Sequence, residues 1–217
     1  MNVSSLIKQY FTSDDNDVTI DVFDEKNIYS VYKRVVSVLT KNMTIETTVL
    51  QGMSYCFYEI LDNVLTHSEK EMGTVITQHL TSEHSLAFLV ADDGRGIQAS
   101  LSENNNYANI SEPDALKISI MDSVTDGKGM GFGLYSTSLL VQNAGLLFIV
   151  RSGNHTLRVQ NGIMSVEKSD FWQGTIVYVR LRTDKEIDPA EVVSRRTDIA
   201  NQYNESFLND SGIEELW

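Results

Sequence analysis

Residues 44–67, TIETTVLQGMSYCFYEILDNVLTH, carry the strongest helical pattern in the 217-residue chain. Their apolar side chains recur at spacings of three and four, which places them on one face of a helix. These side chains are Val49, Leu50, Met53, Phe57, Ile60, Leu61, Val64 and Leu65. The pattern predicts a long helix that buries this face against a core.

Two polar residues of this helix, Glu59 and Asn63, lie four positions apart and therefore project from the same side. They lie beside the apolar stripe, as a polar edge at the rim of a cavity would. A carboxylate can take a proton from an attacking hydroxyl or water, and an amide oxygen suits Mg²⁺. The alternative is that both residues only solvate an amphipathic helix. His67, one turn further on, is interpreted as a helix-end residue near the negative end of the helix dipole.

The sequence around this helix alternates between short strand patterns and helical patterns. Strands are predicted at 18–22, 74–80, 86–91, 146–151, 155–160, 163–168 and 175–181, with 74–80 and 86–91 joined as a hairpin. Further helices are predicted at 27–39, from 111 to about 123, from about 131 to 143 and near 190–203. The segment between Ser102 and Gly131 has polar tracts and clustered glycines with little apolar material to anchor it. We expect it to open easily.

The motif Asp92-Asp-Gly-Arg-Gly-Ile97 directly follows an apolar strand. An Asp at the end of a strand can accept a hydrogen bond from an exocyclic amine. Gly94 and Gly96 let the backbone turn sharply and approach a flat ring. The alternative is an ordinary turn, because Asp-Gly pairs favour turns.

The motif Gly127-Lys-Gly-Met-Gly-Phe-Gly-Leu134 leads into a helical pattern. Free N–H groups of such glycines, together with a helix start, can hold an anion. Lys128 can add a further positive charge. A flexible linker is the alternative, although strong helical patterning follows at once. Neither a P-loop nor a dinucleotide-binding fingerprint is present, because the required Gly-Lys-Ser/Thr and G-x-G-x-x-G patterns are missing.

Taken in order with a final Gly174-Thr175 pair, these motifs resemble the nucleotide-binding boxes of the GHKL superfamily, the Bergerat-fold ATPases of gyrase, HSP90, histidine kinases and MutL. The resemblance equates Glu59 to His67 with the N box, Asp92 to Ile97 with the first glycine box, Gly129 to Leu134 with the second, and Gly174-Thr175 with the closing pair. It implies an α/β fold, namely a two-layer α/β sandwich with a mixed sheet, helices on one face and a mobile ATP lid.

The same resemblance implies a role for each matched residue, with ATP and Mg²⁺ as the ligands. Asn63 binds Mg²⁺, Glu59 is the general base, Asp92 receives the adenine amine and Thr175 supports Asp92. Gly94 and Gly96 shape the adenine pocket, while Gly129, Gly131 and Gly133 wrap the phosphates. Ile97 and Leu134, which close the two glycine boxes, and Lys128 complete the expected nucleotide-binding set.

The domain organisation then reads as an N-terminal segment (1–17), an ATPase domain (18–183) and an acidic C-terminal helix or tail (184–217). No His precedes the N-box helix, and only a short segment follows the domain. The chain therefore resembles most the freestanding anti-sigma-factor serine kinases. On this basis it hydrolyses ATP or transfers the γ-phosphoryl group to a Ser or Thr of a regulatory protein partner. The alternatives are a non-catalytic, nucleotide-switched binding module and the catalytic domain of a split histidine kinase.

The composition excludes several other functions. The chain has 17 Lys and Arg residues and 30 Asp and Glu residues, so its net charge is −13. This negative charge argues against nucleic-acid binding. A single cysteine, Cys56, leaves no intrachain disulfide and fits a reducing compartment. No signal peptide or membrane-length apolar run is evident. We therefore expect a cytoplasmic protein without membrane contact.

Overall fold

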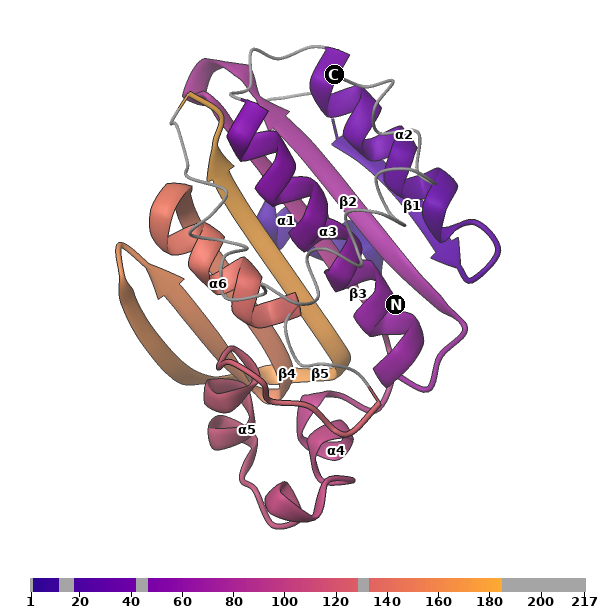
Figure 1. Ribbon diagram of the computed structural model, residues 1–217, viewed down its shortest axis with the longest axis vertical. Coiled ribbons are helices and arrows are strands. Elements are labelled where there is room, and N and C mark those ends of the chain that lie inside the picture. The colour runs from indigo at the N-terminus through magenta and orange to yellow at the C-terminus, as the bar shows by residue number, and fades with distance from the viewer. Residues whose placement is uncertain (1, 12–17, 42–46, 129–132, 185–217) are drawn as a thin grey trace.

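The computed structural model describes residues 2–11, 18–41, 47–128 and 133–184. Their strands form one five-stranded sheet in the order β1-β2-β3-β5-β4. The strands are β1 (Val18–Asp24), β2 (Met72–Leu80), β3 (Ser85–Ala91), β4 (Gly145–Gln160) and β5 (Ile163–Arg182). The helices are α1 (Val3–Tyr10), α2 (Ile28–Lys41), α3 (Thr47–His67), α4 (Ile97–Leu101), α5 (Glu112–Ser119) and α6 (Gly133–Ala144), with 3₁₀ turns at Thr81–Glu83 and Asn105–Tyr107. Figure 1 shows α2, α3 and α6 over one face of the sheet.

The predicted long helix is observed as α3, and its apolar stripe forms the main core. Phe57, Ile60 and Leu61 are almost fully buried against α2 and the inner face of the sheet. The rings of Phe57 and Phe88 of β3 meet edge to face, with centroids 5.2 Å apart. This packing confirms the two-layer α/β sandwich. No helix among the described residues is both long enough and apolar enough to cross a membrane.

The sheet is antiparallel in its four described strand pairings, whereas a mixed sheet was expected. The connection from β3 through α4, α5 and α6 leads to β4 at the edge of the sheet. The strands β3 and β4 run in the same direction, but β5 lies between them and runs in the opposite direction to both. A mixed sheet would need two parallel neighbours, and this strand order separates them.

A helix also lies on the second face of the sheet, so the expectation of helices on one face alone is wrong. Leu6 and Phe11, from α1 and its C-terminal end, are buried against strand residues that point away from the main core. The rings of Phe11 and Tyr178 meet edge to face at 5.8 Å. Because Ile76 and Leu89 also face this side, α1 covers apolar surface that α2, α3 and α6 cannot reach.

Two long strands replace the four short strands predicted between residues 146 and 181. β4 and β5 pair along nearly their whole lengths, and the ladder is interrupted by irregularities around Ser152 and Gly153. Gly153 has a φ of +61°, which lets the strand change direction without ending. The sequence shows turn residues here, but the ladder continues through them.

The segment between the two glycine motifs is partly anchored, which was not expected. Ser111 caps α5 through a bond from the Asp114 N–H, as its sequence predicted, but the helix ends at Ser119 rather than near 123. Ala115 and Leu116 are buried, and Leu116 belongs to the main core. By contrast, residues 102–111 and 120–125 include no buried side chain. This segment, described from residue 102 to 128, is called the lid region below. It consists of one packed helix, α5, between two surface segments.

The position of α1 predicts a measurable stability effect. Leu6→Ala should lower the free energy of unfolding by about 2–5 kcal/mol, because it removes a buried side chain and leaves a cavity. The exposed Lys8, on the same helix, gives the matched control Lys8→Ala, which should change stability little. Urea denaturation measures both. Equal, small effects would show that α1 does not stabilise the second face.

Candidate functional site

The polar edge of α3 meets the start of α6. A Cβ atom built on Gly133, the first residue of α6, would lie 2.9 Å from the Asn63 Nδ2 atom and 3.1 Å from the Glu59 Cβ atom. The helices approach this closely because residue 133 has no side chain. Glu59, Asn63 and Gly133, which lie far apart in the sequence, therefore form one corner of the site.

The side chain of Glu59 at this corner is a weaker acid than an ordinary Glu. Burial, and to a lesser extent the nearby Asp62 carboxylate, raises the pKa of Glu59 to about 7. The protonated and ionised forms are then both accessible near neutral pH. A carboxyl group of this kind can accept a proton from a bound hydroxyl or water.

Asp92 lies at the opposite end of the site, directly after β3, and is 3% exposed. Its Oδ1 atom accepts hydrogen bonds from the Gly94 N–H at 2.8 Å and the Thr175 N–H at 3.2 Å. The described residues give its Oδ2 atom no hydrogen bond. Burial raises the pKa of Asp92 to about 6, although the two amide bonds act in the opposite direction. Thr175 thus supports Asp92 through its backbone.

Close backbone approach explains the glycines around Asp92. A Cβ atom on Gly94 would lie 2.2 Å from the Ser68 carbonyl oxygen. Gly174 has a φ of +94°, and a Cβ atom there would lie 2.5 Å from Asp92 Oδ1. Gly96 has a φ of +80° and packs against Ser152. Each position combines close contact, an unusual φ angle or both, and so requires glycine.

One pocket joins these two ends, between α3, α6, the sheet and the lid region. Its lining includes Asn63, Asp92, Gly96, Ile97, Gly133, Leu134 and Thr175, all of which the sequence analysis selected. Ile60, Val64, Val90 and Val177 add an apolar wall. Gly94 and Glu59 are not among the lining residues. Gly94 donates its N–H to Asp92, and Glu59 lies beside Gly133. Gly129 and Gly131 lie outside the described residues.

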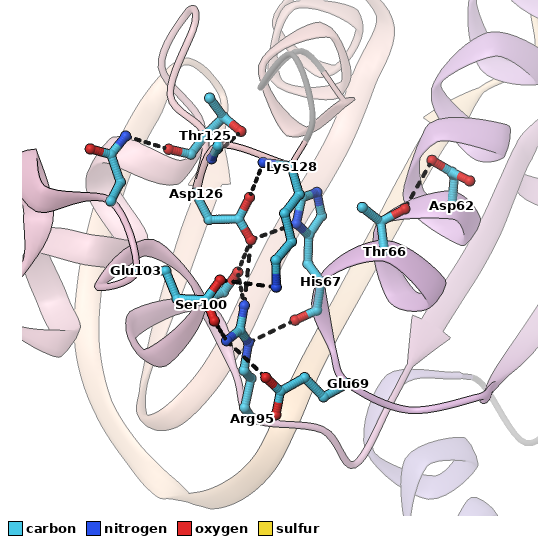
Figure 2. Close-up of polar contacts among 12 residues, drawn as sticks. Asp62, Thr66, His67, Glu69, Arg95, Ser100, Glu103, Thr125, Asp126 and Lys128 are labelled. Carbon is cyan, nitrogen blue, oxygen red and sulfur yellow. Dashed lines mark hydrogen bonds and ion pairs between the residues drawn. The ribbon is translucent and has the colours of Figure 1, made fainter.

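Asp126 is a pocket residue that the sequence analysis did not select. Its Oδ2 atom lies 2.8 Å from His67 Nδ1 and accepts from the Ser100 hydroxyl at 2.7 Å. Its Oδ1 atom accepts from the Lys128 N–H at 2.9 Å. Burial raises the pKa of Asp126, but these hydrogen bonds outweigh it and leave the pKa below its ordinary value. Asp126 therefore joins the lid region to the end of α3 (Figure 2).

Arg95 lies beneath Asp126 and completes this ionic cluster (Figure 2). Its Nε–H donates to the His67 carbonyl at 3.0 Å, and its guanidinium forms ion pairs with Glu69, Glu103 and Asp126. His67 lines the pocket and is more than a helix-end residue. Lys128, expected near phosphate, directs its ammonium to Glu103 at 2.9 Å. Sequence spacing gives no signal for this cluster, because its members come from separate segments.

A comparison with protein families agrees with the geometry. The family model for histidine kinase-, DNA gyrase B- and HSP90-like ATPases matches residues 48–185. The match covers more than half of the chain, and it includes the polar edge of α3, both glycine motifs and the Gly174-Thr175 pair. It confirms the resemblance drawn from the motifs. No curated protein matches the chain.

The close contact at Gly174 predicts a difference between two glycines that both have a positive φ. Gly162 has a φ of +74° and open space around its Cα atom, so Gly162→Ala should cost about 1 kcal/mol through backbone strain alone. Gly174→Ala should cost more and also displace the Asp92 carboxylate. Thermal melting and adenosine binding measure these effects. Equal effects of the two substitutions would contradict the proposed constraint.

Proposed function

Because the chain belongs to the family of histidine kinase-, DNA gyrase B- and HSP90-like ATPases, we propose that its ATP site spans the pocket from Asp92 to Gly133. ATP binding follows from the family. The juxtaposition of Glu59 and Asn63 with Gly133 supports the further proposal that the chain transfers the γ-phosphoryl group, either to water or to a Ser or Thr of a regulatory protein.

The adenine ring lies at the Asp92 end of this proposed site. Oδ1 is held by the Gly94 and Thr175 amides, which leaves Oδ2 to accept from the exocyclic amine. The carbonyl of guanine would face the same carboxylate and be repelled. Val90, Ile97 and Val177 offer apolar contact to the ring. These features support a preference for adenine over guanine nucleotides.

The phosphates lie at the Gly133 end. The start of α6 presents N–H groups and the positive end of a helix dipole, which favour an anion. Asn63 offers the oxygen ligand for Mg²⁺, which prefers oxygen donors and is commonly shared with phosphates. Bound Mg²⁺ would neutralise phosphate charge. Gly129, Gly131 and Lys128, in the second glycine motif, remain proposed contacts of the phosphates.

Glu59 is the proposed general base. It takes the proton from the attacking hydroxyl as the new oxygen–phosphorus bond forms and the bond to the β–γ bridging oxygen breaks, releasing ADP. Its raised pKa and its position beside Asn63 support this role.

A nucleotide-switched binding module is the second candidate function. It is favoured by the Asp126 cluster, which links the pocket to the lid region. In this case nucleotide would change a partner-binding surface without turnover. Incubation with labelled ATP, alone and with a cell lysate, separates the two functions when the wild type is compared with Glu59→Gln. Only a phosphoryl-transfer enzyme produces more phosphate or labelled protein than the lysate with Glu59→Gln does.

Asp92 predicts a pH dependence of binding. Its pKa of about 6 lies above that of an ordinary Asp, so the acceptor form is lost as the pH falls through 6. The charged groups near it are Asp93, which raises this pKa, and Lys70, which lowers it. ATP affinity should therefore fall by up to about tenfold per pH unit below 6, as calorimetry can measure.

Asp92→Asn and Asp93→Asn form the matched pair for this measurement. Asp93→Asn, at an exposed position, should retain wild-type affinity at pH 7. It should move the loss of affinity slightly to lower pH, because it removes a carboxylate that raises the pKa of Asp92. Asp92→Asn should bind ATP weakly at every pH, because the amide can donate as well as accept. A wild-type protein that binds GTP as well as ATP would refute the adenine assignment.

Glu59 and Asn63 should have separable effects. Glu59→Gln should leave ATP binding nearly intact and lower turnover by about 10²–10⁴-fold, the usual contribution of a general base. Asn63→Ala should weaken binding of ATP with Mg²⁺ more than binding of metal-free ATP. Measuring affinity and turnover together tests both. Wild-type turnover in Glu59→Gln would show that Glu59 has no part in the chemical step.

A further inference from the structure

Lys128 lies at the edge of the proposed nucleotide site, but its charge is directed elsewhere. Its backbone N–H binds Asp126, which lines the pocket. Its ammonium has one partner among the described residues, the Glu103 carboxylate at 2.9 Å. The side chains of Lys128 and Glu103 are 45% and 40% exposed, so this ion pair is accessible to solvent. Lys128 and Glu103 can therefore exchange partners without any movement of the buried core.

The Glu103 carboxylate contacts two cations at once. One oxygen pairs with Arg95 and the other with Lys128. Arg95 also binds the His67 carbonyl, Glu69 and Asp126, and its side chain is only 14% exposed. These further contacts hold Arg95 in place. Lys128, with its single partner and long side chain, is the cation that can move.

We propose that Glu103 is an intramolecular competitor of the nucleotide phosphates for Lys128 and so lowers the affinity of the site for phosphate. This inference rests on the proposed function. A bound triphosphate carries more negative charge than one carboxylate, so it can take over the ammonium. Glu103 then loses one of its two cations, and the contact between the two ends of the lid region is weakened.

Protonation does not release Lys128 under ordinary conditions. Hydrogen bonds from Arg95 and Lys128 lower the pKa of Glu103 to about 2, so its carboxylate is ionised near neutral pH. Exchange of the anion is the remaining route. Exposed ion pairs contribute little free energy, so the competition should change ATP affinity by only about two- to fivefold.

The test compares Glu103→Gln with Glu69→Gln. Both substitutions remove one negative charge from a partner of Arg95, but only Glu103 holds Lys128. Calorimetry with ATP and with adenosine at fixed salt gives the affinities. Glu103→Gln should bind ATP about two- to fivefold more tightly and adenosine with unchanged affinity. Glu69→Gln should bind both as the wild type does.

Lys128→Met completes the thermodynamic cycle. In this background Glu103→Gln should give no gain in ATP affinity, because the contested ammonium is absent. An equal gain from Glu69→Gln, or a gain that persists without Lys128, would overturn the inference in favour of a general charge effect. No gain from Glu103→Gln would also overturn it. If the wild type binds no ATP, the proposed function itself fails, and the two failures are thus distinguishable.

Discussion

The bonds that hold the Asp92 carboxylate join the central strand of the sheet, β3, to its neighbour β5 at the pocket. Asp92 ends β3, and Thr175 lies on the neighbouring β5, so the amide bond to Oδ1 crosses the strand pair. The Asp92 N–H also donates to the Thr175 carbonyl at 3.0 Å. A buried carboxylate is costly unless it is hydrogen-bonded, and this geometry supplies its donors. The glycines at 94 and 174 are required by this geometry, because a side chain at either position would meet the Asp92 carboxylate.

The helix α3 connects the Asp92 end of the site to its other end. Its apolar stripe fixes its rotation over the sheet, and that rotation determines where Glu59 and Asn63 point. The same packing brings α6 close enough that only glycine fits at position 133. Stability and chemistry thus depend on adjacent faces of one helix. A substitution in the Phe57 to Leu61 stripe would disturb the site through helix rotation as well as through stability.

Local patterns predicted α3 and the β2–β3 hairpin well, because helix and strand periodicities are short-range signals. The motifs, through their resemblance to the nucleotide-binding boxes, also selected seven residues that line the pocket. The antiparallel order of the sheet and the position of α1 were not predictable in this way. Both depend on which apolar faces remain uncovered after folding. The Arg95 and Asp126 cluster was missed for another reason, because its carboxylates and cations come from separate segments that local patterns do not relate to one another.

The pocket and the lid region share residues, which has a mechanical consequence. Asp126 lines the pocket, binds the end of α3 through His67 and holds the Lys128 amide. Within the same region, the Glu112 carboxylate of α5 accepts from the Asn154 N–H and lies 2.7 Å from His155 Nδ1 on β4. Apolar burial of Leu116 anchors the middle. The surface segments 102–111 and 120–125 therefore lie between fixed contacts, because Glu103 pairs with Arg95, α5 is packed on the core and Asp126 binds the end of α3. Glu103 and Asp126 share the Arg95 guanidinium, so the ionic contacts near both ends of the lid region meet at one side chain.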